Sequence, residues 1–450
     1  MKKIASLLVC LFMLLTFASC LPENDNTITE VDTDKVVSKY EEAQKETDGQ
    51  SKSSNSDSSS TSKKQTSSTV SKTIVTEETK QKVEDKLKDA PISLSENTDW
   101  GSMDNIVNSK DFAENIIEYD DNDPAYRKPY VYIKTPEDLM NLSRSVMQGS
   151  NYSACNVQIL NDLDMTGIEW IPLGTPENPF RGSIDGNKHT IKNLSISKIN
   201  ESAIDSDGSA YLGFLGVHID AAIFNLNIEN ISINVRATEN SPYVFAGGIA
   251  GYYSSYTLSS PAWNVKVSGN INIKNPALGV ASVGGVYGVA NFVGYEETLE
   301  LDRMDSKVNM SVDGFYTITG GIVGSGSFDI PNETEMIFTN FTYNGTINDK
   351  SNLSFVGGFC GLCNGYGTPT FRDSSFSTTV KRVLDNETSE DIQILGIIAG
   401  GIDVYTDSFT FENINGNIIY NGKICDSAFC GIEQGKVVYN SCTPNIKLPN

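Results

Sequence analysis

The sequence predicts an all-β protein, a parallel β-helix with a short N-terminal capping helix, behind a disordered linker. Three observations predict this fold. A glycine-rich block recurs at a nearly constant interval, short runs of alternating apolar and polar residues lie between the blocks, and a low-complexity Ser/Lys-rich stretch precedes the first block. A fixed repeat length indicates similar units stacked on one another.

The first twenty residues have the order of an export signal. Lys2 and Lys3 precede an apolar run at residues 4–15, which is shorter than the roughly 20 residues that span a bilayer. Small residues then lead into Cys20, as in a cleaved signal peptide. The residues FASC that end at Cys20 resemble a bacterial lipobox, and this resemblance implies cleavage after residue 19 and a diacylglycerol on the Cys20 sulfur. An ordinary cleaved signal with an incidental cysteine is the alternative.

We therefore expect a protein anchored to a membrane by lipid, because two or more acyl chains suffice for stable anchoring. Leu21 stands where an aspartate is associated with inner-membrane retention, so the expected location is the outer membrane or the cell surface. Removal of residues 1–19 takes away two lysines, which gives 32 − 57 = −25 for the mature chain against −23 for the whole chain. This acidity argues against a nucleic-acid partner, since phosphate binding needs a basic surface.

Eight cysteines are present, of which Cys10 leaves with the signal peptide and Cys20 takes the lipid. An exported protein can keep disulfides, but the sequence does not give their connectivity. Cys360 and Cys363 have the spacing of a zinc or redox pair. The two histidines of the chain are far away in sequence, so we expect buried thiols or a local disulfide. The remaining cysteines are Cys155, Cys425, Cys430 and Cys442.

Residues 20–98 are the predicted linker. Its centre, residues 51–72, is almost entirely Ser, Thr and Lys and cannot bury enough apolar surface to offset chain entropy. A coil of this length has an end-to-end distance of roughly 50 Å. Residues 99–129 form a transition segment, and residues 130–450 form the predicted repeat domain.

One helix is expected at the start of the repeat domain, within residues 135–146. Thr135 is the predicted N-cap, Pro136 the first helical residue and Asp138 the acid at the third position. Apolar residues at helical spacing follow. Such a helix can cover the open end of a stack of strands, whose edge would otherwise favour aggregation.

The glycine blocks give the length of the repeat. Successive blocks are 35 to 38 residues apart, and glycine permits close approach of backbone to backbone. The glycines predicted to be equivalent are Gly213, Gly248, Gly285, Gly321, Gly358, Gly396 and Gly431.

A second landmark between the blocks is an Asn or Asp after a mostly bulky residue. Repeated Asn at one corner of a solenoid can form a ladder of side-chain amides that also bond to the turn backbone. Asn193 is a possible earlier copy. The residues predicted to form this corner are Asn225, Asn264, Asp302, Asn340, Asp373, Asn413 and Asn440.

Each unit of about 36 residues thus holds roughly three short strands with no helix between them. Stacked coils of a solenoid fit this count. A propeller is the rival fold, but its blades need four strands in roughly 40–50 residues.

Parts of residues 130–235 resemble the GLUG-motif family of bacterial surface proteins. The resemblance implies a right-handed β-helix, often in adhesin-like or host-interacting proteins, and supplies no catalytic residues. The matching elements are the aspartates of residues 157–164, the Trp-x-Pro-Leu-Gly segment at residues 170–174, the Asp-Gly-Asn-Lys-His-Thr-Ile turn at residues 185–191 and the glycine block at residues 211–216.

Several polar residues could carry chemistry, although a structural role explains each of them. Asp162 and Asp164 share a face of a strand and could be a catalytic or metal-binding pair, with Glu169 nearby. His189 lies in a turn where a side chain usually bonds the turn backbone. We expect no cofactor; calcium is possible at the acidic clusters of residues 119–124 and 205–208, but neither has the full loop spacing with a closing Glu.

Three tyrosines beside Ser and Thr are candidate ligand contacts, namely Tyr252, Tyr253 and Tyr256, with core packing as the alternative. The expected function is non-catalytic adhesion, or binding of host, cell-surface or polysaccharide partners. A polysaccharide lyase or hydrolase is the alternative, by analogy of fold. A zinc peptidase is disfavoured because neither histidine begins a His-Glu-x-x-His motif.

Overall fold

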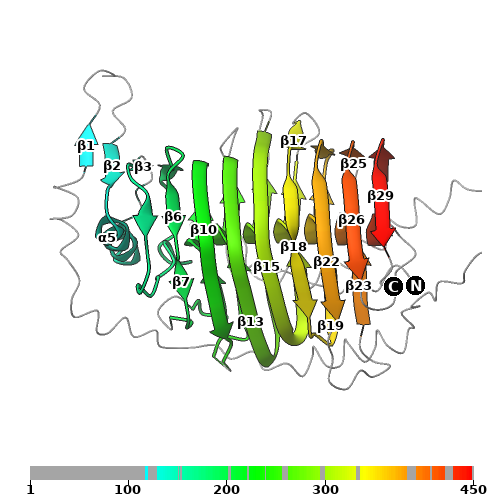
Figure 1. The fold of residues 1–450 in the computed structure, drawn as a ribbon, viewed down its shortest axis with the longest axis horizontal. Helices are drawn as coiled ribbons and strands as arrows, with labels where there is room; N and C mark the ends of the chain where they lie inside the picture. Colours follow the sequence, from blue (N-terminus) through cyan, green and yellow to red (C-terminus); the bar gives the residue numbers. More distant parts are fainter. Residues whose placement is uncertain are drawn as a thin grey trace, which may run out of the picture. The chain divides into compact units, whose positions relative to one another are not determined.

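The computed structural model describes residues 117–119, 129–150, 152, 155–200, 204–219, 222–238, 240–255, 262–293, 299–330, 335–382, 392–405, 408–420 and 429–447. These residues form a parallel β-solenoid with one helix, which confirms the predicted all-β class (Figure 1). The predicted signal peptide, the linker and Cys20 lie outside the described residues.

The described strands belong to two sheets. The smaller sheet has 7 strands: β9 (Leu215–Ile219), β12 (Ala250–Ser255), β14 (Tyr287–Val293), β16 (Val323–Asp329), β20 (Cys360–Tyr366), β24 (Ala399–Val404) and β27 (Cys430–Gln434). The larger sheet has 22 strands: β1 (Ile117–Tyr119), β2 (Pro129–Ile133), β3 (Asn156–Ile159), β4 (Leu163–Asp164), β5 (Ser183–Asp185), β6 (Thr190–Lys192), β7 (Ser195–Ile196), β8 (Ser209–Leu212), β10 (Ile223–Arg236), β11 (Tyr243–Gly247), β13 (Ala262–Gly284), β15 (Leu299–Gly320), β17 (Met336–Thr339), β18 (Thr342–Asp349), β19 (Leu353–Gly357), β21 (Thr370–Arg372), β22 (Ser375–Arg382), β23 (Ile392–Gly396), β25 (Phe409–Glu412), β26 (Asn415–Tyr420), β28 (Val437–Asn440) and β29 (Thr443–Lys447).

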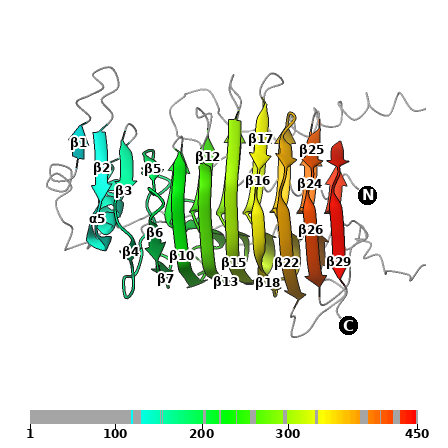
Figure 2. The same ribbon diagram turned by 45° about the horizontal axis from the view of Figure 1, so that its top comes forward.

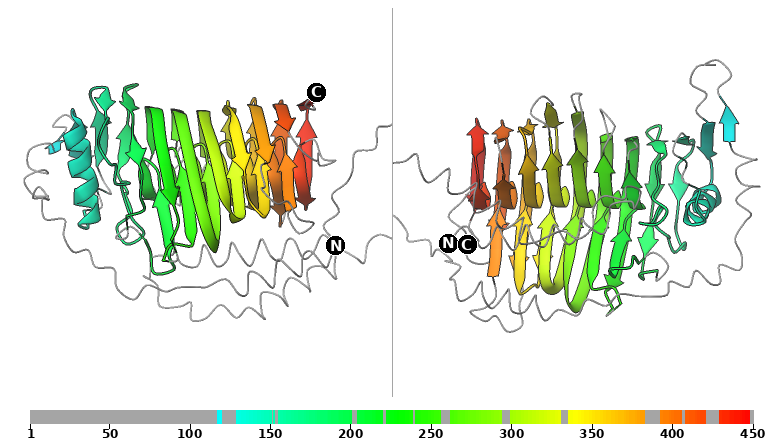
Figure 3. Two further views of the ribbon diagram at one scale, coloured as in Figure 1. Left: turned by 60° about the horizontal axis from the view of Figure 1, so that its bottom comes forward. Right: turned by 180° about the vertical axis from the view of Figure 1, so that it is seen from behind.

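Apart from β1, each described strand pairs in parallel with the equivalent strand of a neighbouring coil. The long strands β10, β13 and β15 lie side by side in chain order, and β18, β22, β26 and β29 continue the row (Figures 1 and 2). Among the described strands, β1 and β2 form the antiparallel pair. The strands of the smaller sheet also follow one another in chain order, and the views of Figure 3 show the coils succeeding one another along the solenoid.

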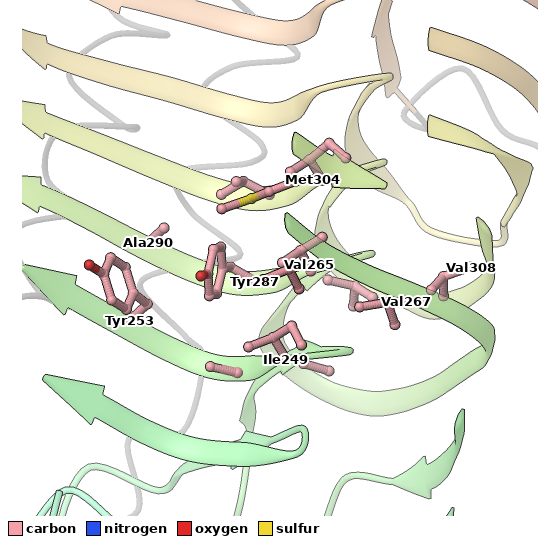
Figure 4. Close-up of a cluster of buried hydrophobic side chains, with 14 of the residues drawn as sticks. Ile249, Tyr253, Val265, Val267, Tyr287, Ala290, Met304 and Val308 are labelled. Atoms are coloured by element: carbon pink, nitrogen blue, oxygen red, sulfur yellow. The ribbon is translucent and has the colours of Figure 1, made fainter. Parts of the chain in front are cut away.

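The core is built from the inward-facing residues of the strands, which alternate with outward-facing ones. In the second half of β10, residues 231–236 alternate strictly between buried and exposed, as expected for strands with one face toward the core. Figure 4 shows the inward side chains of neighbouring coils, among them Val265, Tyr287 and Met304, packed on one another. Aromatic rings stack from coil to coil: Phe371 lies 4.6 Å from Phe338 and 4.8 Å from Phe411, between ring centroids.

The predicted capping helix is confirmed as α5 (Pro136–Met147). The Thr135 side chain accepts a bond from the Asp138 N–H, and the Asp138 carboxylate accepts one from the Thr135 N–H, so the capping box is complete. Leu139, Leu142 and Val146 are fully buried in the core cluster. The helix therefore covers the N-terminal end of the solenoid core (Figure 1).

The strand register corrects the predicted alignment of glycines. The seven glycines predicted to be equivalent fall into three separate columns. Two of them, Gly213 and Gly396, belong to the first column, in which the register also pairs Gly247, Gly284, Gly320 and Gly357. The second column lies one residue later in each block and holds Gly248, Gly285, Gly321 and Gly358. Gly431 belongs to the third column, where it stacks on Gly400 and continues the line of Gly251, Gly288, Gly324 and Gly361. The blocks vary in sequence, so the spacing of glycines alone could not distinguish three neighbouring columns.

The predicted Asn corner is correct at five positions and displaced by one residue at two. Residues at this corner have φ between 52° and 58°, and they are Asn225, Asn264, Arg303, Asn340, Asp373, Asn413 and Ser441. Asp302 and Asn440 therefore precede the corner, because they pair with Trp263 and Glu412. Asn193 belongs to a different corner, where it accepts a bond from Asn230 Nδ2 at 2.7 Å.

The side chains of the corner bond in pairs between coils. Asn264 Nδ2 donates to Asn225 Oδ1 at 2.8 Å, and Asn413 Nδ2 donates to Asp373 Oδ1 at 2.7 Å. Asn340 Nδ2 donates to the displaced Asp302 at 2.8 Å. The ladder thus ties neighbouring coils together at the edge of the sheet.

Candidate functional site

The prediction that Tyr252 and Tyr253 contact a ligand is wrong. Their side chains are 3% and 0% exposed. Tyr253 points into the core, where its ring lies 5.1 Å from that of Tyr287, and Tyr252 packs edge-on against Tyr211. Both stand on β12, a strand of the seven-stranded sheet, and not in a loop. Tyr256 lies outside the described residues.

The acidic residues singled out near the N-terminus connect neighbouring coils. Asp162 Oδ1 accepts from the Thr190 N–H at 3.0 Å, Asp164 Oδ1 accepts from Asn193 Nδ2 at 2.9 Å, and Glu169 accepts from Ser197. The bond from the Thr190 N–H lowers the pKa of Asp162 below the usual range of a carboxyl. Bonds from the Thr166 hydroxyl and from Asn193 likewise lower the pKa of Asp164. Each of the three carboxylates thus accepts a hydrogen bond from a neighbouring coil, which favours the structural role.

The two histidines have different environments. His189 Nδ1 lies 3.2 Å from Asp162 Oδ1 at the surface. His218 is fully buried, stacks between Phe180 and Tyr253, and burial lowers its pKa to about 3. A neutral buried imidazole of this kind packs like an aromatic ring.

Asp205, in the second acidic cluster considered for calcium, is a buried hydrogen-bond acceptor. Its carboxylate accepts from the Asp207 and Ser209 N–H groups and from the Tyr211 hydroxyl. Burial raises its pKa to about 6 although these bonds oppose the shift. The first cluster lies almost wholly outside the described residues, and within the described part of the chain no His, Cys, Asp and Glu side chains gather in threes with metal-ligand geometry.

Cys155, Cys360, Cys363 and Cys442 are free thiols. Cys360, Cys363 and Cys430 are buried in the core cluster, and Cys155 and Cys442 are half-buried at its margin. Burial raises the pKa of the Cys363 thiol well above its usual value. These side chains pack as small apolar groups, and Cys425 lies outside the described residues.

The structure brings together a polar surface that sequence motifs did not reveal, which we call the long-strand face. It consists of the outward side chains that follow the corner in β10, β13, β15, β18 and β22, and neighbouring strands lie about 4.8 Å apart. Nearly all are amides, hydroxyls or charged groups. They are Asn227, Glu229, Ser232, Asn234, Arg236, Lys266, Ser268, Asn270, Asn272, Lys274, Asp305, Lys307, Asn309, Ser311, Asp313, Thr342, Asn344, Thr346, Asn348, Ser375, Ser377, Thr379 and Lys381.

The charge of the long-strand face is opposite to that of the chain. Five cationic side chains stand against three carboxylates on this face, a balance of 5 − 3 = +2, whereas the whole chain has a net charge of −23. At physiological salt the screening length is about 8 Å, so a bound group senses mainly the charges of the face itself.

A hollow of about 270 Å³ lies on this face between β6, β10, β13 and β15. Its charged lining comes from Glu229, Lys266, Asp305 and Lys307. Lys266 stands opposite Asp305 in the register, yet none of the four forms an ion pair within 4.0 Å among the described residues. The Asp305 carboxylate instead accepts from the Thr342 hydroxyl at 2.7 Å. Two ammonium groups and two carboxylates are thus available to a ligand.

Sequence reasoning missed this site because its residues belong to four successive coils and form no local motif. Lys266 and Asp305 are paired across strands 39 positions apart in the numbering. The sequence did hold one signal for this site. Aligning the repeats would have shown that the polar residues of the alternating segments recur at the same positions.

No protein-family model and no curated protein sequence matches the chain. A solved structure from Bacteroides ovatus, described as a putative immunoglobulin A1 protease, is similar with a TM-score of 0.42 and 17% sequence identity, covering 69% of this chain and 84% of that chain. Within the described residues, no helix has the length and apolarity needed to cross a membrane.

Proposed function

We propose that this protein is a lipid-anchored bacterial surface protein that binds polysaccharide along its long-strand face without chemically changing it. The observation that carries the proposal is the long-strand face itself. It presents rows of amides, hydroxyls and lysines at a constant strand spacing, around a hollow lined by two lysines and two carboxylates.

A polysaccharide fits the chemistry of this face. Amides and hydroxyls exchange hydrogen bonds with sugar hydroxyls, and the ammonium groups of Lys266 and Lys307 can bind sugar carboxylates or sulfates. An extended polymer can contact several coils at once, so weak contacts add through multivalency. The rigid strands hold the side chains in place, which reduces the entropy lost on binding.

The anchor at Cys20 and the spacer of residues 20–98 complete the proposal. The lipid holds the chain at the envelope, and the spacer separates the solenoid from the lipid headgroups. A Cys20→Ala variant should be released into the soluble fraction while its solenoid stays folded, as measured by fractionation and circular dichroism.

The binding test compares the full chain with the double variant Lys266→Ala/Lys307→Ala on immobilised acidic polysaccharides such as polygalacturonate and heparin. We expect about a tenfold or larger loss of affinity, since each charged hydrogen bond contributes on the order of 1.5–3 kcal/mol. Lys436→Ala removes an exposed lysine away from this face and should bind like the unmodified chain.

Equal binding by the double variant and the Lys436→Ala control would contradict the proposal, as would the absence of binding to every polymer tested. Binding should also weaken with salt, because the lysine contacts are electrostatic.

A polysaccharide lyase or hydrolase is the second candidate. The observation that favours it is the convergence of Glu229 and Asp305 with two lysines in one hollow, which offers acids and a possible base to a bound sugar. Release of shorter or unsaturated products from the same polymers, abolished in Asp305→Asn, would establish this activity.

A further inference from the structure

A second surface with a different chemistry lies at the end of β20, a strand of the seven-stranded sheet. Tyr366, at the end of β20, is 48% exposed. With Ile419, it is one of two large hydrophobic side chains that are exposed among the described residues. Tyr366 and Asn364 point to the same side because alternate residues of a strand share a face.

The ring of Tyr366 is held in place by its neighbours. The Tyr405 ring lies 4.8 Å away between centroids, tilted by 53°, and Asn364 Nδ2 donates to the Tyr405 hydroxyl at 2.8 Å. Gly365 and Gly367 on either side of Tyr366 have φ of 149° and 91°, which fixes the turn at the end of the strand. The exposed ring is therefore preorganised.

Polar groups border this ring. The register places Asp329 opposite Tyr366 on the preceding coil, and Asp329 is exposed. Ser327 and Asp403 stand on either side of Asn364 on the neighbouring coils. An exposed aromatic ring beside a few fixed acceptors and donors suits a ligand that is apolar on one face and hydroxylated at its edge.

We propose that Tyr366, positioned by Tyr405 and Asn364, is the stacking residue of a binding site for neutral sugars. The C–H groups on one face of the sugar ring pack on the tyrosine, and its hydroxyls donate to the exposed carboxylate of Asp329. This carboxylate disfavours anionic sugars, so this site differs in ligand from the long-strand face. A tyrosine has only two side-chain torsions, so little entropy is lost when it binds.

The experiment measures binding of the full chain to a printed array of neutral oligosaccharides, with acidic oligosaccharides as a second arm. Tyr366→Ala should lose about tenfold or more in affinity for the neutral glycans, as expected for a central aromatic contact. Tyr366→Phe should stay within about twofold because it keeps the ring. Ile419→Ala, the other exposed apolar side chain, is the matched control and should bind like the unmodified chain.

Retained binding of neutral glycans by Tyr366→Ala would overturn the proposal, and so would an array on which no neutral glycan binds. Equal losses in Tyr366→Ala and Ile419→Ala would also overturn it. The double variant Lys266→Ala/Lys307→Ala should keep neutral-glycan binding, so failure of this site and failure of the long-strand face are distinguishable.

Discussion

At the scale of single residues, the corner of the solenoid depends on side chains that tolerate a left-handed backbone. Asn264 has a φ of 52° and donates through its amide to Asn225 at 2.8 Å. Asn is one of the few residues with a Cβ that adopts this conformation readily. The same amide that suits the backbone also bonds the preceding coil.

Substitutions at Asn264 should separate these two contributions. Asn264→Ala loses the hydrogen bond and strains the backbone, so we expect about 2 kcal/mol lower free energy of unfolding. Asn264→Gly loses the bond but accepts the positive φ and should cost about half as much. Chemical denaturation measures both, and equal costs would show that backbone conformation contributes nothing here.

A second residue-scale feature is the buried carboxyl of Asp205. Burial raises its pKa from 3.8 to about 6, so the folded state holds a proton that the unfolded state releases over this pH range. The stabilisation is therefore complete below pH 4 and is lost as the pH rises through 6. The opposing bonds from Ser209 and Tyr211 reduce the shift without reversing it.

The variant Asp205→Asn should remove this pH dependence. It can keep the bonds from the backbone N–H groups and has no titrating proton. As the pH falls from 7 to 4, the free energy of unfolding of the unmodified chain should rise by up to about 3 kcal/mol relative to that of the variant. The size of this difference follows from the pKa shift of Asp205. Urea titrations at several pH values measure the difference, and parallel stability curves would refute the assignment.

At the scale of elements, close approach of the two sheets depends on the third glycine of each block. A Cβ added to Gly324 would lie 2.5 Å from the Gly288 carbonyl oxygen and 2.7 Å from the Val283 nitrogen. These atoms are backbone, which cannot yield without moving a strand. Gly326, two residues later, has only side-chain atoms of Phe328 and Cys360 at 3.3 Å or more.

The pair of variants Gly324→Ala and Gly326→Ala should therefore differ sharply. We expect at least about 3 kcal/mol of destabilisation for Gly324→Ala and about 1 kcal/mol or less for Gly326→Ala. Thermal unfolding followed by circular dichroism compares them. Similar melting temperatures would mean that the sheets tolerate separation at this block.

At the scale of the whole molecule, each coil is stabilised mainly by its two neighbours. The inner strands β13 and β15 pair on both sides, whereas β29 pairs with β26 alone among the described strands. In a repeat stack, stability is approximately the sum of unit and interface terms, so the ends open first.

Amide hydrogen exchange should follow this order. Amides of β13 and β15 should exchange slowest, and those of β28 and β29 at least about tenfold faster, because the terminal coil lacks an outer neighbour. Mass spectrometry of deuterated peptides gives the comparison. Uniform protection along the stack would indicate that the described coils unfold as a single cooperative unit.

The sequence by itself determined the repeat, the parallel solenoid and the capped helix. These features depend on local physics: period-2 alternation, glycine at close contacts, and a capping box complete within four residues. It also placed five of the seven corner residues, since a positive φ favours Asn and Asp over most side chains.

Only the tertiary structure decided the register between coils, and the register decides which side chains meet. The register places Arg303, and not Asp302, at the corner. It also places Lys266 beside Asp305, and the packing of the strands buries Tyr252. Residues about 37 positions apart leave no local trace of such contacts, because loop length and strand pairing together set them. The surfaces available for binding were therefore visible only after the coils were stacked.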